Sequence, residues 1–409
     1  MIWNWELSFV AIATFILIGL LLAAVILYAR AKLVSTVPCK IFLNEDKVLE
    51  AAGGATLLGT LLKQKIPIPS PCGGKATCRQ CKVRVISGGG QILDTDKATF
   101  SKKELAAGWR LSCQCKVRED LHIKIPAELL DVKEFEGRVL SNENVATFIK
   151  ELVVELPQDL TYASGAYLLF HVPAFSTNTE EWSMDPKFRV DWEKFGLLGH
   201  KIQFQEECIR AYSMASFPAE GRTVKFTIRI ATPPKPKVPW GICSSYSFSL
   251  KAGEKVRLSG PYGESFMRPG DAPVVFLIGG AGSSFGRSHI LHLFNTEKTE
   301  RKIDLWYGAR SLKENIYERE YRELAEKHPN FSYNLVLSEP LPEDQWPTDP
   351  VKKNFLFKAF ELGQLSKMKA PEDSLYYICG PPMHNKSIMK LLDDYGVARE
   401  NIVLDDFGN

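Results

Sequence analysis

The stretch PCGGKATCRQC, residues 71–81, places three cysteines in the pattern C-x5-C-x2-C within a glycine-containing loop. A fourth cysteine, Cys113, follows on a later predicted strand. Structural zinc sites usually combine two short knuckles, whereas one loop of three cysteines with a distant fourth is typical of plant-type ferredoxins, here with x5 in place of x4. The pattern predicts a [2Fe-2S] cluster on Cys72, Cys78, Cys81 and Cys113. Zinc and a set of buried thiols remain as alternatives, and Cys115 is a rival fourth ligand.

The sequence around this loop predicts a small β-rich domain over residues 34–128. The segments CKIFLN, CKVRVIS, RLSCQCKV and LHIKIP have strand-like character, and ATLLGTLLKQ reads as one short helix. A small β-rich fold crossed by a helix fits this order of elements.

An uncharged segment of 23 residues, 7–29, precedes this domain. At 1.5 Å per residue, a helix of that length spans a hydrocarbon core of about 30 Å. Arg30 and Lys32 follow it directly, and Trp3 and Trp5 stand at its other end, which predicts an anchor over residues 1–33 with the remainder in the cytoplasm. A cleaved signal peptide is the alternative, but no Lys or Arg precedes the apolar run.

The composition excludes several classes of protein. The chain has 409 residues, 45% of them hydrophobic and 24% charged, which is ordinary for a globular protein of several domains. The formal net charge is only +3 and no long basic run occurs, so the chain lacks the electrostatic footprint of a nucleic-acid-binding protein. Nine cysteines, most of them isolated, argue against a disulfide scaffold and for a reducing compartment.

A second block, residues 129–270, alternates apolar and polar residues in several runs and predicts an antiparallel β-barrel. A long loop at 174–199, with Trp182 and Trp192, interrupts it and is either functional or a structural wrap.

Two motifs in this block suit a flavin. In RAYSMAS, residues 210–216, Arg210 can meet a diphosphate, while Tyr212 and Ser213 offer an aromatic ring and a hydroxyl to an isoalloxazine. In GICSSYSFSL, residues 241–250, the residues Gly241, Ser244 and Ser245 open a helix whose first amides can bind a diphosphate, or else form a plain capped turn.

The third block, residues 271–409, alternates strands with helices and predicts a doubly wound parallel sheet, with ligands at the carboxyl ends of its strands. In GGAGSSFG, residues 279–286, the glycines permit close backbone approach to a pyrophosphate, and CGPP, residues 379–382, offers a place for a nicotinamide. The predicted nucleotide contacts are Gly279, Gly280, Gly282, Arg310, Gly380 and Pro381. His289 and His292 are expected to be surface or packing residues.

The choice between NADH and NADPH stays open at this level. The acidic residue expected at the end of the second strand of this block is missing, and Arg310 and Ser311 stand there instead. Arg310 can meet a 2'-phosphate, whereas Glu339 would repel one.

Together the three blocks resemble the family of F subunits of the Na+-translocating NADH:quinone oxidoreductases of bacterial inner membranes. The resemblance covers essentially the whole chain through CGGKATC, RAYSMAS, IRIATPP, GPYGE, GGAG, CGPP and the terminal DDFG. It implies that the first block is a β-grasp [2Fe-2S] ferredoxin domain. It also implies FAD bound by Arg210, Tyr212, Ser213, Gly241 and Ser244, Phe407 covering the flavin ring, and Cys379 beside flavin and nicotinamide. Two departures are Ala76, where the family usually has glycine, and Phe285, where it usually has proline.

The resemblance also implies why these parts share one chain. NADH gives up two electrons as a hydride and a [2Fe-2S] cluster accepts one, so FAD must stand between them. We expect Ser213 to supply a hydrogen bond at the reacting flavin atom, and electrons to pass on to other membrane subunits and finally to quinone. Sodium movement is expected elsewhere in the complex, because the apolar segment has no carboxylate. Rival functions are the reductase component of an oxygenase and a membrane-tethered zinc-binding scaffold.

Overall fold

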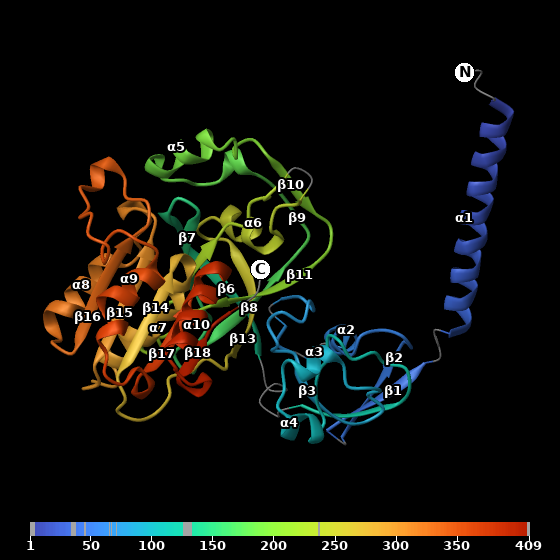
Figure 1. Ribbon diagram of the computed structural model, residues 1–409, viewed down its shortest axis with the longest axis horizontal. Helices are drawn as coiled ribbons and strands as arrows, with labels where there is room; N and C mark the ends of the chain where they lie inside the picture. Colours follow the sequence, from blue (N-terminus) through green and yellow to red (C-terminus); the bar gives the residue numbers. More distant parts are fainter. Residues whose placement is uncertain are drawn as a thin grey trace. The chain divides into compact units, whose positions relative to one another are not determined.

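The computed structural model describes residues 5–33, 38–44, 46–64, 66, 68–70, 72–125, 133–235 and 238–406 (Figure 1). Its contacts divide the chain into two units. One comprises Met1–Pro69 and Gly74–Asp131, and the other comprises Ser70–Gly73 and Val132–Asn409. The predicted boundary between the first two blocks, at residues 128 and 129, and the predicted site residue Phe407 lie outside the described residues.

The apolar N-terminal segment forms the single helix α1 (Trp5–Leu33), in which Phe9 and Phe15 are exposed. Measured by length together with apolarity, none of the helices in the described ranges qualifies as a membrane span. This finding differs from the predicted membrane helix over residues 7–29.

The rest of the first unit contains a five-stranded sheet in the order β2-β1-β5-β3-β4. Strands β1 and β2 form an antiparallel hairpin, and β1 pairs with β5 in parallel. The elements are β1 (Cys39–Leu43), β2 (Lys47–Ala51), α2 (Leu57–Lys63), β3 (Lys82–Ser87), α3 (Asp94–Lys97), α4 (Lys102–Ala106), β4 (Trp109–Leu111) and β5 (Leu121–Lys124).

Helix α2, at the position that the sequence predicts, packs on this sheet. The Thr56 side chain caps α2 by accepting a hydrogen bond from the Gly59 amide (3.1 Å), which satisfies one of the amides left without a partner at a helix start. Leu57 and Leu61 of this helix are fully buried with Ile41 of β1 and Val83 of β3. The apolar core therefore lies between helix and sheet.

The second unit begins with a six-stranded antiparallel sheet in the order β11-β8-β13-β6-β7-β12. Just beyond β11, the Ala215 amide donates to the Lys225 carbonyl in β12 (2.7 Å), but no ladder joins β11 to β12 among the described residues. The closed barrel therefore stays a prediction. The strands are β6 (Lys133–Ala146), β7 (Ile149–Glu155), β8 (Tyr167–Val172), β11 (Cys208–Ser213), β12 (Thr223–Arg229) and β13 (Lys255–Tyr262), and α6 (Ile242–Ser249) packs beside them.

The insertion predicted at residues 174–199 folds against this sheet. It contains β9 (Phe175–Asn178), which pairs with β10 (Lys201–Phe204), and α5 (Pro186–Lys194). Trp182 and Trp192 are buried in the hydrophobic core beside the six-stranded sheet, and both pack against Phe248 of α6. This packing favours a structural wrap around the sheet over a functional loop.

The remaining strands form a five-stranded parallel sheet in the order β16-β15-β14-β17-β18, with the helices between them (Figure 1). Order and direction confirm the predicted α/β architecture. The elements are β14 (Val274–Gly279), α7 (Ser283–Asn295), β15 (Ile303–Ala309), α8 (Glu318–Lys327), β16 (Phe331–Leu337), α9 (Leu356–Gly363), β17 (Leu375–Cys379), α10 (Pro382–Asp394) and β18 (Ile402–Leu404).

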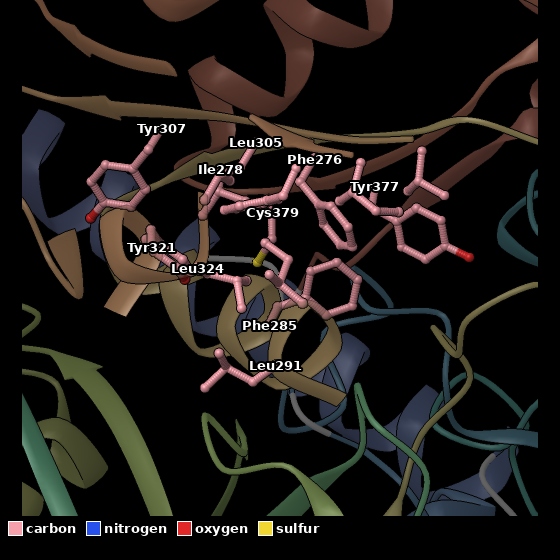
Figure 2. Packing of buried hydrophobic residues seen from close by; sticks show 14 of the residues in the cluster. Phe276, Ile278, Phe285, Leu291, Leu305, Tyr307, Tyr321, Leu324, Tyr377 and Cys379 are labelled. Atoms are coloured by element: carbon pink, nitrogen blue, oxygen red, sulfur yellow. The ribbon is translucent and has the colours of Figure 1, made fainter. Parts of the chain in front are cut away.

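Helices cover both faces of this sheet because alternate side chains of β14 point to opposite sides. Phe276 and Ile278 pack in the cluster that contains residues of α7 and α8, whereas Leu277 packs in the cluster that contains residues of α9 and α10. Figure 2 shows Phe285 of α7 close to Cys379 within the first cluster. The Phe285 departure from the family pattern is thus accommodated as a fully buried ring near Tyr377.

Candidate functional site

A cavity of about 580 Å³ lies where the six-stranded antiparallel sheet meets the five-stranded parallel sheet. Its walls come from the ends of β11 and β12 and from the carboxyl ends of β14, β15 and β17, the edge at which doubly wound sheets bind ligands. Nine of the predicted site residues line it: Tyr212, Ser213, Gly279, Gly280, Gly282, Arg310, Cys379, Gly380 and Pro381.

Three polar side chains meet at this cavity. The Ser213 hydroxyl donates a hydrogen bond to the Asp405 carboxylate (3.0 Å), and the Cys379 sulfur lies 3.9 Å from the same oxygen. Burial raises the pKa of Asp405 to about 7, and the nearby Asp406 charge adds to this rise, while the bond from Ser213 opposes it. Burial, followed by the two carboxylates, also raises the pKa of the Cys379 thiol. Near neutral pH the site therefore holds a thiol and a carboxyl group that exchanges its proton.

The glycine turn after β14 brings backbone against backbone. A Cβ on Gly282 would lie 2.3 Å from the Cys379 carbonyl oxygen, so no larger residue fits without movement of the chain. The Thr227 hydroxyl donates to the Ala281 carbonyl (2.9 Å), and the Thr227 amide donates to the Ser284 hydroxyl (2.9 Å). These bonds fix β12 to the turn and to the first residues of α7, of which Ser284 and Phe285 line the cavity.

Two arginines and the acidic residue Glu314 line one part of the cavity. Arg229 at the end of β12 and Arg310 after β15 both line it. Burial lowers the pKa of Arg229, and the neighbouring Arg310 charge adds to the effect. Arg310 lies 3.7 Å from the Glu314 carboxylate, which also accepts a hydrogen bond from the Thr147 amide (3.1 Å). Glu339 is not among the described lining residues, although its amide donates to the Arg310 carbonyl (2.8 Å).

The other predicted flavin contacts lie outside this cavity wall, at β11 and the start of α6. Ser244 ties the helix start to the preceding strand region, because its hydroxyl accepts from the Ala231 amide (3.1 Å) and donates to the Gly241 carbonyl (3.1 Å). The Ser245 hydroxyl is fully buried and has no hydrogen-bond partner. A Cβ on Gly241 would lie 2.6 Å from Ala231. Helix amides, an unsatisfied hydroxyl and Arg210 nearby on β11 fit a diphosphate.

The predicted cluster cysteines Cys72, Cys78, Cys81 and Cys113 are all buried. The side chains of Cys81 and Cys113 are hydrogen-bonded to each other, which together with burial raises the pKa of Cys81. The Gln114 side-chain amide donates to the Cys113 sulfur (3.5 Å). Among the described residues, no group of three or more His, Cys, Asp or Glu side chains is arranged so that it could hold a metal ion. Binding of the cluster by the four cysteines therefore stays a prediction.

The backbone of the cysteine loop shows why glycine suits the position at which this chain has Ala76. Gly73, Gly74, Ala76 and Arg79 all have positive φ, and that of Ala76 is +62°. Glycine adopts this conformation without steric cost, whereas alanine does not. The alanine therefore occupies a position whose geometry favours glycine.

Sequence reasoning missed Asp405 and Arg229 as lining residues. Both belong to segments quoted for the family resemblance, DDFG and IRIATPP, and alternation with Thr227 along β12 was the available signal for Arg229. Nothing local to Asp405 indicates that it meets Ser213.

Three domain families match the chain. They are a 2Fe-2S iron-sulfur cluster binding domain over residues 41–118, an oxidoreductase FAD-binding domain over 194–266, and an oxidoreductase NAD-binding domain over 276–388. The first match contains all four predicted cluster cysteines, including the distant Cys113.

Curated relatives extend the match to the full length. The chain is similar to the F subunit of the Na(+)-translocating NADH-quinone reductase of Chlamydia felis, with 55% identity over 100% of both chains. It is also similar to the F subunit of the same reductase of Pseudomonas aeruginosa, with 45% identity over 98% of each.

Solved structures share the fold at lower identity. The cytochrome P450 reductase GcoB of Amycolatopsis is 22% identical with a TM-score of 0.60, over 90% of this chain and 98% of that one. A ferredoxin reductase in carbazole 1,9a-dioxygenase is 19% identical with a TM-score of 0.57, over 91% of this chain and 99% of that one.

Proposed function

Because the chain belongs to the family of F subunits of the Na(+)-translocating NADH-quinone reductases, we propose that its cavity is where NADH and FAD react. The chain is an NADH-oxidising subunit that depends on FAD and a [2Fe-2S] cluster. Hydride transfer from NADH to flavin and single-electron transfer to the cluster are the chemistry that these groups supply when bound. The meeting of Ser213, Cys379 and Asp405 at one cavity carries the proposal.

The chain's own residues would act by positioning and by moving a proton. Ser213 is held by Asp405 and offers its hydroxyl at the cavity wall. When Asp405 is protonated it can donate to Ser213, which frees the Ser213 proton for a bond into the cavity. Cys379 supplies a buried thiol at the glycine turn, against which a nicotinamide ring can lie. Phe407 is proposed to cover the flavin, on the family resemblance alone.

The residues that would hold the cofactors divide into three groups. Arg210, Tyr212, Gly241, Ser244 and Ser245 would hold FAD, and the unsatisfied Ser245 hydroxyl supports that assignment. Gly279, Gly280, Gly282, Arg310, Gly380 and Pro381 would hold NADH. Cys72, Cys78, Cys81 and Cys113 would bind the cluster, supported by their burial and by the Cys81–Cys113 contact.

The chain's place in a larger assembly is the second part of the proposal. Other membrane subunits would receive the electrons and pass them to quinone, and residues 1–33 would anchor the chain in the bacterial inner membrane with the remainder in the cytoplasm. The uncharged segment 7–29, followed by Arg30 and Lys32, supports this anchor. Domain limits at 1–33, 34–128, 129–270 and 271–409, and a closed flavin barrel, belong to the same proposal.

An anaerobic titration of the full chain with NADH, and separately with NADPH, tests the electron path. We expect NADH to bleach the flavin absorption and to raise the EPR signal of a reduced [2Fe-2S] cluster. A colourless protein, or flavin reduction with no cluster signal even under dithionite, would contradict it. Removal of residues 1–33 tests the anchor, because the shortened chain should leave the membrane fraction while the full chain stays in it.

A further inference from the structure

A pair of cysteines outside the proposed reaction lies beside the predicted flavin contacts. Cys208 is the first residue of β11, and Cys243 is the second residue of α6. Their sulfur atoms are 3.7 Å apart, with the Cys243 thiol donating to Cys208. The two elements carry the predicted diphosphate contacts Arg210, on β11, and Gly241, at the start of α6.

The two thiols differ in accessibility and in acidity. Cys208 is partly exposed, whereas Cys243 is buried. The hydrogen bond from Cys243 holds the pKa of Cys208 below its ordinary value, and the Arg210 charge helps. The same bond, followed by burial, raises the pKa of Cys243. Near neutral pH the accessible sulfur is therefore the better nucleophile, and its neighbour keeps its proton.

A partly exposed, acidic cysteine next to a second thiol is the arrangement found in redox-sensitive pairs. We propose that Cys208 and Cys243 form a peroxide-reactive dithiol that converts to an intramolecular disulfide. Cys208 would be the attacking sulfur and Cys243 the resolving one. The proposal rests on the contact between the two sulfurs and on the exposure of only one of them.

The chemistry balances with hydrogen peroxide as the oxidant. The Cys208 thiolate attacks one peroxide oxygen, the O–O bond breaks, and the departing hydroxide takes a proton to become water. The Cys243 sulfur then attacks the sulfenic acid on Cys208, the S–O bond breaks, and a second water leaves with the thiol proton. Two thiols lose two electrons and two protons, and one peroxide becomes two waters.

Closing the disulfide would disturb the flavin contacts. The sulfurs must approach from 3.7 Å to a bond length of about 2.05 Å, through rotation of both side chains or movement of α6 against β11. We expect FAD to be held several-fold less tightly in the oxidised form. This consequence rests on the proposed function, whereas the disulfide itself does not.

Peptide mapping of the full chain tests the disulfide. The protein is treated with hydrogen peroxide, alkylated and digested with trypsin, which gives one peptide over residues 202–210 and another over 238–251. We expect these peptides to be joined after peroxide treatment and released by dithiothreitol. Full alkylation of both cysteines, or conversion of Cys208 to sulfonic acid without a cross-link, would overturn the proposal.

Two variants and a control assign the roles. Cys243→Ser should stop at a sulfenic acid on Cys208, trapped by dimedone, and Cys208→Ser should give neither product. Cys39→Ser, a buried cysteine of the first unit, should cross-link like the unaltered chain. A dimedone adduct on Cys243 in the Cys208→Ser variant would reverse the assigned order and contradict the proposal.

Flavin fluorescence after gel filtration tests whether the disulfide weakens FAD binding, separately from whether the disulfide forms. Peroxide should release FAD from the unaltered chain several-fold faster than from Cys243→Ser, and cluster damage would affect both alike. A cross-link without faster release would leave the dithiol in place and refute its coupling to FAD. A reduced protein that holds no FAD would instead count against the proposed function.

Discussion

The cysteine loop and the nucleotide cavity differ in how their residues come together. In the loop, three predicted ligands lie within residues 72–81, and the Cys81–Cys113 contact joins neighbouring strand ends in one small unit. In the cavity, Ser213 and Asp405 are 192 positions apart, and the Thr227 amide of β12 donates to the Ser284 hydroxyl of α7. The loop is a local chemical pattern, whereas the cavity exists only because two sheets pack together.

The largest effect expected is the loss of the cluster when its distant fourth ligand is removed. Cys113→Ala should abolish the EPR signal of the reduced cluster, because a [2Fe-2S] centre needs four ligands. Flavin reduction by NADH should continue, since the cavity residues are unchanged. Cys115→Ala is the matched control, a buried cysteine two residues away whose sulfur lies 3.9 Å from the Gly89 carbonyl. If Cys115→Ala loses the signal and Cys113→Ala keeps it, the ligand assignment is wrong.

The second prediction concerns a substitution in the cavity that leaves the cysteine loop unchanged. Ser213→Ala should slow flavin reduction by NADH on the order of 10²-fold, because it removes the hydroxyl that we propose to bond the reacting flavin atom. Stopped-flow absorbance measures the rate, and EPR under dithionite should show an unaltered cluster. Ser249→Ala removes a hydroxyl that donates to the Tyr246 carbonyl within α6 (2.8 Å), and we expect it to leave the rate unchanged. Equal rates in both variants would remove Ser213 from the reaction.

The third prediction concerns stability against pH. The pKa of Asp405 is raised from 3.8 to about 7, so between these values the folded chain binds more protons than the unfolded chain. The contribution of this group to the free energy of unfolding therefore falls as pH rises from about 4 to about 7, and it stays constant above about 7. Asp405→Asn should remove this fall, which amounts to a few kcal/mol for a fully buried carboxyl group.

Urea unfolding at a series of pH values measures this difference. The exposed Asp373→Asn variant serves as the control and should follow the unaltered chain. An Asp405→Asn variant with the same pH dependence as the unaltered chain would show that Asp405 is ionised throughout, contrary to its burial.

The smallest effect is expected at the mouth of the cavity. Arg310 is about half exposed and lies 3.7 Å from Glu314, so solvent screens its charge. Arg310→Ala should raise the KM for NADH several-fold with little change in kcat, because it removes binding common to substrate and transition state. Arg319→Ala breaks a similar pair with Glu323 on the exposed face of α8 and should change neither constant. A loss in kcat instead would place Arg310 in the reaction itself.

Much of the fold follows from short-range sequence signals. The alternation of strands with helices after residue 271 and the glycine turn after β14 predict the parallel sheet and its binding edge. The insertion at 174–199 shows the limit of such signals, because its two tryptophans suited either a functional loop or a structural wrap. Only the packing of Trp182 and Trp192 against Phe248 favours the second.

By itself, the sequence determined the features whose physical basis is local: the cysteine spacing, the β and α periodicities, and the glycines that allow close backbone approach. Tertiary structure decided which distant side chains meet. Ser213 reaches Asp405, Arg229 and Arg310 line the same cavity, and Cys208 lies against Cys243. A residue's burial and charged neighbours set its pKa, and both depend on packing between elements. The sequence alone therefore does not show that the pKa of the Asp405 carboxyl group lies near 7 or that the pKa of Cys208 is lowered.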